Sequence, residues 1–271
     1  MGVSSFWIPQ AWTRVNVMSV IVLNYHHVSH RPMALSLAPR VFESQLRWLQ
    51  REGYTFLRQA EFEIAMTKPN SANSRAVLVT FDDGCADIFE YAFPILRELG
   101  VPSTHFVITE RLENPSDRDH FTWDHAEQMV ASGLVELASH SHWHRNYDHQ
   151  GAQLSMVLDQ MEMDLEQSRD VLFRRLGHRN HHLAWPWGYN PPEYQAIATR
   201  LGFDWQYQAY FGRADGLTGQ TKIPRIRTDG SLSRIFEPWV KLWTSPLGAL
   251  MTPALAAKNM RSQRLVARTT H

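Results

Sequence analysis

The chain alternates short apolar runs with longer segments of helical periodicity, and this alternation constrains its fold more than any other feature. The apolar runs occupy residues 20–25, 76–81, 104–109, 134–139, 182–185, 205–210 and 222–226. A strand, a crossover helix and a parallel strand, repeated about seven times, is the pattern of an α/β fold. The length of 271 residues fits one such domain, and an α/β barrel in particular.

The segments between these runs carry the marks of helices. Helices are expected near 39–52, 92–99, 122–132, 153–176 and 192–201. Glycines at 53, 100 and 177 end three of them, and consecutive prolines at 191 and 192 open the last. In the longest helix, leucines and methionine at 154, 158, 161, 165 and 172 are expected to face inward.

We divide the chain into an N-terminal extension (1–18), one domain (19–243) and a C-terminal tail (244–271). The tail is apolar and then basic, which fits either a packed or frayed terminus or a contact with a membrane surface. The sequence shows no signal peptide and no run of about 18 apolar residues, so we expect a cytoplasmic protein that works at most at the inner membrane face.

Charge and cysteine content exclude several classes of function. Lysine plus arginine and aspartate plus glutamate both number 27, so no overall basic field attracts nucleic acid. The single cysteine, Cys85, cannot form an internal disulfide or a zinc site built from cysteines. We therefore expect any metal to be held by histidines and carboxylates.

Two adjacent carboxylates, Asp82 and Asp83, follow the apolar run 76–81. They repel each other, and a cation or a shared proton would relieve that repulsion. The competing interpretation is a pair of helix N-cap residues, because aspartate is favoured there and a helical segment follows.

Two further clusters also follow expected strands, where parallel α/β folds gather functional groups. His140 and His144 are four residues apart, so one helical turn would place both imidazoles on one face, while His142 would point elsewhere. Trp185 and Trp187 flank Pro186 in a rigid aromatic turn that suits either core packing or sugar rings.

Together the clusters offer one aspartate and two histidines, a three-ligand set with a position open for water. That composition is expected of a catalytic rather than a structural zinc-type site. The remaining carboxylate would then act as a base.

These motifs resemble those of the polysaccharide deacetylases with NodB homology, carbohydrate esterase family 4. Thr-Phe-Asp-Asp-Gly at 80–84 is similar to the family's first motif, and His-Ser-His-Trp-His at 140–144 to its second, His-Ser/Thr-x-x-His. Segments 25–28, 42–45, 53–54 and 223–226 resemble the branch that deacetylates exopolysaccharides such as poly-N-acetylglucosamine in biofilms.

The resemblance implies a distorted (β/α)7 barrel. It also implies that Asp82 is the general base and that Asp83, His140 and His144 hold one divalent metal ion. We expect zinc, although mixed nitrogen and oxygen ligands also accept cobalt, nickel or iron.

The chain departs from the family pattern at two places. The family often has Arg-x-Pro-Phe/Tyr in its third motif, whereas this chain has Ala-Trp-Pro-Trp at 184–187, so no arginine there can orient the base. No late motif supplies the histidine that protonates the leaving group. We propose His26 for that role, because it follows the strand 20–25 and should reach the same barrel mouth. Alternatively, His26 bonds a neighbouring loop, or Asp82 alone relays the proton.

The expected reaction is hydrolysis of N-acetyl groups on hexosamine units of a saccharide, with release of acetate. We assign Tyr25, Trp185, Trp187 and Arg225 to substrate binding, and the resemblance implies an oxyanion-binding N–H near Trp187. Two alternatives remain: a deacylase acting on a lipid-linked or small sugar, and a saccharide-binding barrel without catalysis. The expected partners are the saccharide, with peripheral contact to a membrane or to exopolysaccharide synthesis machinery, and no nucleic acid.

Overall fold

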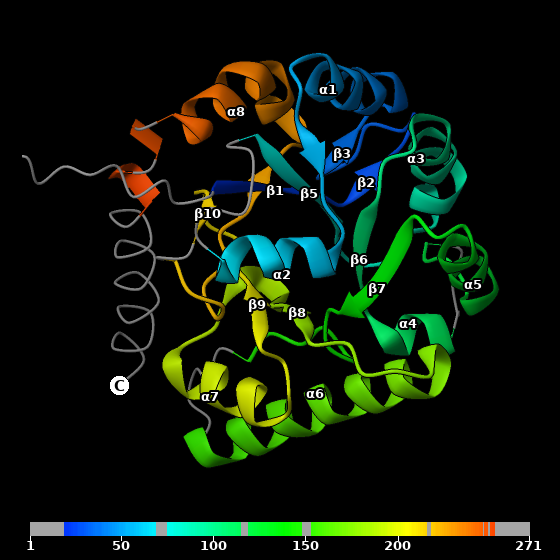
Figure 1. Ribbon diagram of the computed structural model, residues 1–271. Helices are drawn as coiled ribbons and strands as arrows, with labels where there is room; N and C mark the ends of the chain where they lie inside the picture. Colours follow the sequence, from blue (N-terminus) through cyan, green and yellow to red (C-terminus); the bar gives the residue numbers. More distant parts are fainter. Residues whose placement is uncertain are drawn as a thin grey trace, which may run out of the picture.

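The computed structural model describes residues 19–68, 75–114, 119–147, 153–215, 218–245, 247–248 and 250–252. The expected N-terminal extension and most of the expected C-terminal tail lie outside these residues. Within them, a curled sheet of mainly parallel strands is surrounded by helices (Figure 1). No helix in these ranges is both long and apolar enough to cross a membrane.

The six principal strands lie in the order β1-β5-β6-β7-β8-β9, each parallel to its neighbour. They are β1 (Ser19–Tyr25), β5 (Ala76–Phe81), β6 (Ser103–Val107), β7 (Val135–Ser139), β8 (His182–Ala184) and β9 (Trp205–Tyr207). Short strands extend the sheet: β4 (Thr55–Phe56) beside β5, and β10 (Ala214–Asp215) antiparallel to β1. A separate pair joins β2 (His27–Val28) to β3 (Ser36–Leu37).

Residues 223–227 close the curled sheet into a barrel. Ile223 forms a bridge to Tyr207 of β9, and β11 (Ile226–Arg227) pairs in parallel with Leu23 and its neighbour in β1. The segment therefore takes the seventh position, between the last and first principal strands. This confirms the expected distorted (β/α)7 barrel, although the final strand is shorter and later than the run 222–226 predicted.

Eight α-helices lie in the described ranges. They are α1 (Pro39–Arg51), α2 (Gln59–Thr67), α3 (Phe93–Leu99), α4 (Thr109–Glu113), α5 (Trp123–Ala131), α6 (Leu154–Leu176), α7 (Pro192–Arg200) and α8 (Phe236–Thr244). A π-helical turn (Ile88–Ala92) precedes α3. The sequence did not predict α2, α4 or α8. It was wrong about Leu154, which is 44% exposed, because burial along α6 begins only at Val157.

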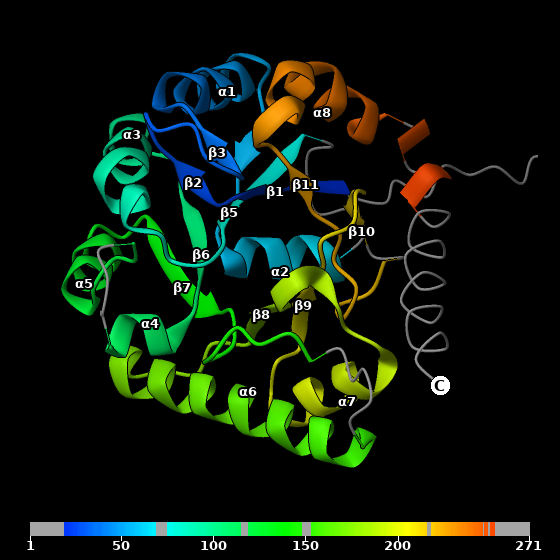
Figure 2. The ribbon, with the colours of Figure 1, turned by 180° about the vertical axis from the view of Figure 1, so that it is seen from behind.

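Helix α2 closes one end of the barrel. Its Phe62, Ala65 and Met66 pack in one buried cluster with Val20 and Ala76. These two residues lie at the amino-terminal ends of β1 and β5. In Figure 1 α2 lies across the ring of strands, and in Figure 2 the opposite end faces the viewer. The carboxyl ends of the strands, at that opposite end, are left to carry the site.

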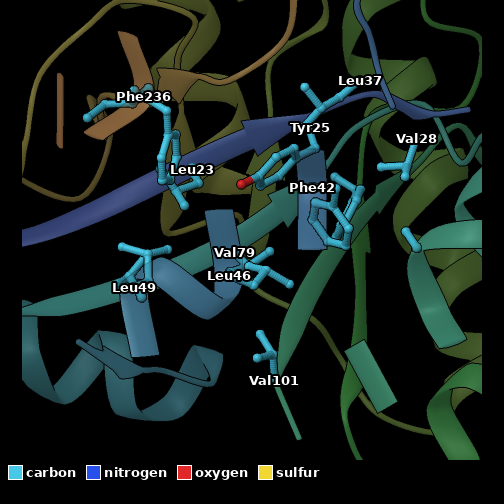
Figure 3. Close-up of a cluster of buried hydrophobic side chains, with 14 of the residues drawn as sticks. Leu23, Tyr25, Val28, Leu37, Phe42, Leu46, Leu49, Val79, Val101 and Phe236 are labelled. Carbon is cyan, nitrogen blue, oxygen red and sulfur yellow. The ribbon is translucent and has the colours of Figure 1, made fainter. Parts of the chain in front are cut away.

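The outward faces of β1 and β5 pack under helices. Leu23 and Val79 contact a cluster that includes Phe42, Leu46 and Phe236 from α1 and α8 (Figure 3). Since both faces of these strands are buried, their sequences are nearly continuous in apolar residues. That packing fixes the strand ends rigidly in space.

Candidate active site

The carboxyl ends of β5 and β7 bring three of the predicted ligands together. One carboxylate oxygen of Asp83 and one ring nitrogen each of His140 and His144 all lie within 4.8 Å of one another. Nε2 of His140 is 3.3 Å from Asp83 Oδ1, and Nε2 of His144 is 3.6 Å from the same oxygen. Both imidazoles therefore point their Nε2 atoms at one carboxylate.

The two histidines reach this position through a loop, not through the helical turn that their spacing suggested. Residues 140–147 contain no helix, and Ser141 and His144 adopt left-handed φ angles of 62° and 54°. A hydrogen bond from the His144 N–H to Ser141 Oγ, 2.9 Å, stabilises the turn. The side chain of His142 bonds Thr109 Oγ1 at 2.8 Å, so it points away from the other two rings, as expected.

The donor set fits a tetrahedral metal ion. Zn–N and Zn–O bonds of about 2.0–2.2 Å at a tetrahedral angle separate a nitrogen from an oxygen ligand by about 3.4 Å. The observed separations of 3.3 and 3.6 Å lie on either side of that value. His140 also donates from Nδ1 to the carbonyl oxygen of Ala184 at 2.8 Å, and in the neutral ring this bond leaves the lone pair on Nε2, the atom that faces Asp83.

Asp164 of α6 holds the loop that carries the histidines. Its carboxylate is fully buried and accepts hydrogen bonds from the backbone N–H groups of His142 (2.6 Å) and Trp143 (2.8 Å). The hydroxyl of Tyr147 donates a third bond at 2.9 Å. Asp164 was not predicted from the sequence, in which the only signal was an acidic residue on the inward face of a helix, where leucine would be ordinary.

Asp82 is 2% exposed, and its charge is neutralised by a buried arginine. Arg225 donates from Nη1 to Oδ1 at 2.6 Å and from Nη2 to Oδ2 at 2.7 Å, and Asn24 Nδ2 donates to Oδ2 at 3.3 Å. Burial acts to raise the pKa of Asp82, but the positive charge of Arg225 outweighs it and the pKa lies below its ordinary value. Asp82 is therefore ionised at neutral pH.

Arg225 thus does what the arginine absent from 184–187 was expected to do. Barrel closure through residues 223–227 carries it to Asp82, and its Nε donates to the Gln208 carbonyl at 3.1 Å. The segment 223–226 had been noticed in the sequence, but nothing local to it indicated a partner so far away in the chain.

Three assignments to sugar contact need correction, because the side chains are buried in the fold. Arg225 is 2% exposed and bonded to Asp82. Tyr25 is 1% exposed and donates its hydroxyl to Gln45 at 2.9 Å within the core. Trp185 is 3% exposed and donates its indole N–H to Gln206 at 3.1 Å. None of the three has surface to offer a saccharide.

Trp187 has the opposite environment. Its side chain is 67% exposed, and its ring centroid lies 5.3 Å from that of His144. The residue adopts φ 59°, and Asp83 adopts φ 70°. Left-handed backbone is costly for residues other than glycine and gathers at functional sites. Of the five such residues in the described ranges, Asp83, Ser141, His144 and Trp187 lie around the same strand ends, and the fifth, Leu35, directly precedes β3.

His26 lies at the same barrel mouth, directly after β1. Its Nε2 is 3.9 Å from Asp82 Oδ2, and its Nδ1 is 3.4 Å from Asp229 Oδ2. The side chain is 13% exposed, so one edge remains accessible. Asp229 was not identified from the sequence; it is held by Arg227 at 2.7 Å.

Two of the three candidate ligands, Asp83 and His144, line a groove of about 810 Å³. Its lining also includes His27, Asp87, Tyr91 and Trp143. A groove of this volume is large enough for a small-molecule or oligosaccharide segment. Its polar lining suits hydroxyl-rich ligands.

Comparisons with known proteins agree with this geometry. A family model described as polysaccharide deacetylase matches residues 70–205, which include the three candidate metal ligands and Asp82. The poly-beta-1,6-N-acetyl-D-glucosamine N-deacetylase of Staphylococcus aureus (strain MRSA252) is 25% identical over 244 residues, covering 83% of this chain and 83% of that protein.

Two solved structures share the fold. The Streptococcus pyogenes deacetylase PplD in complex with acetate superposes with a TM-score of 0.75 and 24% identity, covering 85% of this chain and 100% of that one. IcaB from Ammonifex degensii superposes with a TM-score of 0.73 and 23% identity, covering 83% of this chain and 97% of that one.

Proposed function

The chain belongs to the polysaccharide deacetylase family, and on that premise we propose that it removes N-acetyl groups from N-acetylhexosamine units of a saccharide, releasing acetate. The observation that carries the proposal is the convergence of one buried carboxylate, Asp82, with the Asp83–His140–His144 set at the head of a groove. A carboxylate base beside a three-ligand metal set is one arrangement that catalyses hydrolysis of an amide.

Asp83, His140 and His144 would hold one divalent ion, and zinc suits the set best. When bound, such an ion lowers the pKa of water and polarises a carbonyl. The chain prepares this set in two ways. Burial lowers the pKa of His144 to about 4, so its ring is neutral and available as a ligand at pH 7. The Ala184 carbonyl orients His140 from the far side of the ring.

Asp82 would accept the proton of the attacking water. Arg225 and Asn24 fix the carboxylate in one orientation. Oδ2 accepts two of these bonds and Oδ1 only one, so Oδ1 retains a lone pair that can accept a proton. The pairing keeps Asp82 ionised although it is buried. Arg225 acts through Asp82 and is a positioning residue.

His26 would donate a proton to the departing amine nitrogen, which leaves poorly as an anion. Its Nε2 lies 3.9 Å from Asp82 and its Nδ1 lies 3.4 Å from Asp229, so the ring stands between two carboxylates at the barrel mouth. The alternative role for His26 is a bond to the neighbouring loop, where Asp229 lies, and the His26→Gln variant distinguishes the two. A relay through Asp82 alone predicts a different pH profile.

For the substrate, we propose a poly-N-acetylglucosamine-type exopolysaccharide. The Staphylococcus aureus relative is named for that polymer, and the groove and the exposed ring of Trp187 beside His144 offer space and a flat apolar face for sugars. Removing acetyl groups turns neutral units into cationic ones, which changes how such a polymer adheres in a biofilm.

Mass spectrometry of β-1,6-linked N-acetylglucosamine oligomers after incubation with the zinc-loaded protein tests this. We expect products lighter by whole acetyl losses, with acetate in equal amount. Asp82→Asn should retain the metal and lose about two to four orders of magnitude in rate, whereas Asp159→Asn, on the exposed face of α6, should behave as wild type. If only lipid-linked or monomeric sugars were deacetylated, the polymer would be rejected as the substrate. Near-normal activity of Asp82→Asn would reject Asp82 as the general base.

A further inference from the structure

A second cluster of metal-binding side chains lies beside the first. It consists of His27 on β2 together with Cys85 and Asp87, which follow β5. One ligand atom of each residue lies within 4.8 Å of the other two. Cys85 is 3% exposed, and the side chains of His27 and Asp87 are 24% and 15% exposed. All three line the groove, and none has a part in the proposed hydrolysis.

The imidazole of His27 connects the other two side chains. Its Nδ1 lies 2.9 Å from Asp87 Oδ2, and its Nε2 lies 3.6 Å from Cys85 Sγ. A carboxylate on one ring nitrogen fixes the tautomer that leaves the other nitrogen with a free lone pair. That nitrogen is the one beside the sulfur.

The separation of the two donor atoms matches that around a metal ion. Zn–S of about 2.3 Å and Zn–N of about 2.0–2.1 Å at a tetrahedral angle place sulfur and nitrogen about 3.6 Å apart. The Nε2–Sγ distance of 3.6 Å needs no adjustment to accept an ion between them. The other oxygen of Asp87, Oδ1, is buried without a hydrogen-bond partner. A buried carboxylate oxygen in that state is costly unless positive charge lies near.

We propose that Cys85 Sγ and His27 Nε2, with Asp87 orienting the imidazole and balancing charge, form a second divalent-cation site, distinct from Asp83–His140–His144. The thiolate selects ions of the zinc and cobalt class over magnesium, manganese or calcium. Binding displaces the thiol proton, which is released to solvent. Water or sugar hydroxyls in the groove complete the coordination. The sequence predicted that any metal would be held by histidines and carboxylates, so a site that includes Cys85 departs from that expectation.

Titration of the metal-free full chain with Co²⁺ tests the proposal, because Cys85 is the only cysteine in the sequence and therefore its only thiol. A near-ultraviolet thiolate-to-cobalt charge-transfer band can therefore come only from this site. We expect wild type to bind two equivalents and to develop that band. His144→Ala should lose the first site but keep the band. Cys85→Ser should lose the band while keeping one equivalent and the visible absorption of the first site.

Two further measurements do not depend on the fold of a cysteine variant. His27→Gln changes a partly exposed position. It should lower the cobalt affinity of this site at least tenfold, measured as the cobalt concentration at which the charge-transfer band develops. X-ray absorption of wild type loaded with two equivalents of zinc should show a sulfur neighbour at about 2.3 Å. One equivalent at saturation, or two equivalents with no sulfur signal by either method, would overturn the proposal.

Discussion

Replacing Arg225 by methionine tests the link between barrel closure and the proposed base. Methionine keeps the length of the side chain and removes the guanidinium. Asp82 then loses bonds of 2.6 and 2.7 Å and keeps only the 3.3 Å bond from Asn24. Because Asp82 is 2% exposed, water cannot replace what is lost. Removing one partner of a buried ion pair costs about 3–5 kcal/mol of unfolding free energy.

Thermal melts at pH 7 measure that cost. At about 2–4 °C per kcal/mol for a domain of this size, Arg225→Met should lower Tm by roughly 6–20 °C. Arg200→Met is the matched control. Arg200 pairs with Glu162 at 2.8 Å, but its side chain is 61% exposed, and exposed pairs contribute about 0–1 kcal/mol.

The pH dependence distinguishes loss of the ion pair from loss of packing. In wild type the pKa of folded Asp82 lies below its ordinary value, so the pair adds stability above the unfolded pKa of about 3.9 that disappears as pH falls. In Arg225→Met the main effect that opposes burial is lost, so the pKa of Asp82 rises. The stability gap between variant and wild type should therefore close toward pH 4, and the acid limb of kcat/KM should move to higher pH. If the two proteins gave parallel curves of unfolding free energy against pH, and the acid limbs of their kcat/KM profiles coincided, Arg225 would not be the residue that keeps Asp82 ionised.

The remaining predictions concern single side chains around the site. Trp187→Ala should weaken saccharide binding with little change in Tm, because the ring is 67% exposed, whereas Trp185→Ala should cost about 3–5 kcal/mol, as buried aromatics do; the reverse pattern would exchange their roles. His26→Gln should retain metal and fold but lower kcat and remove the high-pH limb of the rate profile, and an unchanged limb would leave Asp82 as the only proton carrier. Asp164→Asn should weaken zinc binding about 10–100-fold, measured by chelator competition, while Asp159→Asn should not; equal affinities would show that the loop does not depend on Asp164.

The strands and the candidate metal ligands could be predicted from the sequence because the information about them is local. Strand β5 coincides with the predicted 76–81, since a strand buried on both faces is a continuous apolar run. The ends of parallel strands meet at one edge of a barrel, so residues after such runs are brought together whatever the loops do. That rule placed Asp83, His140 and His144 within reach of one another.

The geometry of the loops and the burial of single side chains could not be predicted, because they depend on residues far away in the chain. Spacing suggested a helical turn for His140 and His144, but the bonds from Asp164, more than twenty residues on, hold a loop with left-handed residues instead. Trp185 and Trp187 are two residues apart and chemically alike. One is buried and the other is exposed, because the turn between them reverses which side faces the core.

The partner of the base was decided by tertiary structure alone. Arg225 lies 143 positions after Asp82, and no periodicity or motif spacing connects residues so far apart. They meet because residues 223–227 fit between β9 and β1 and close the barrel. The sequence by itself determined which side chains gather at the strand ends. The closed ring determined which of them are buried, charged and paired, because the charge state of a group depends on neighbours that only the folded chain supplies.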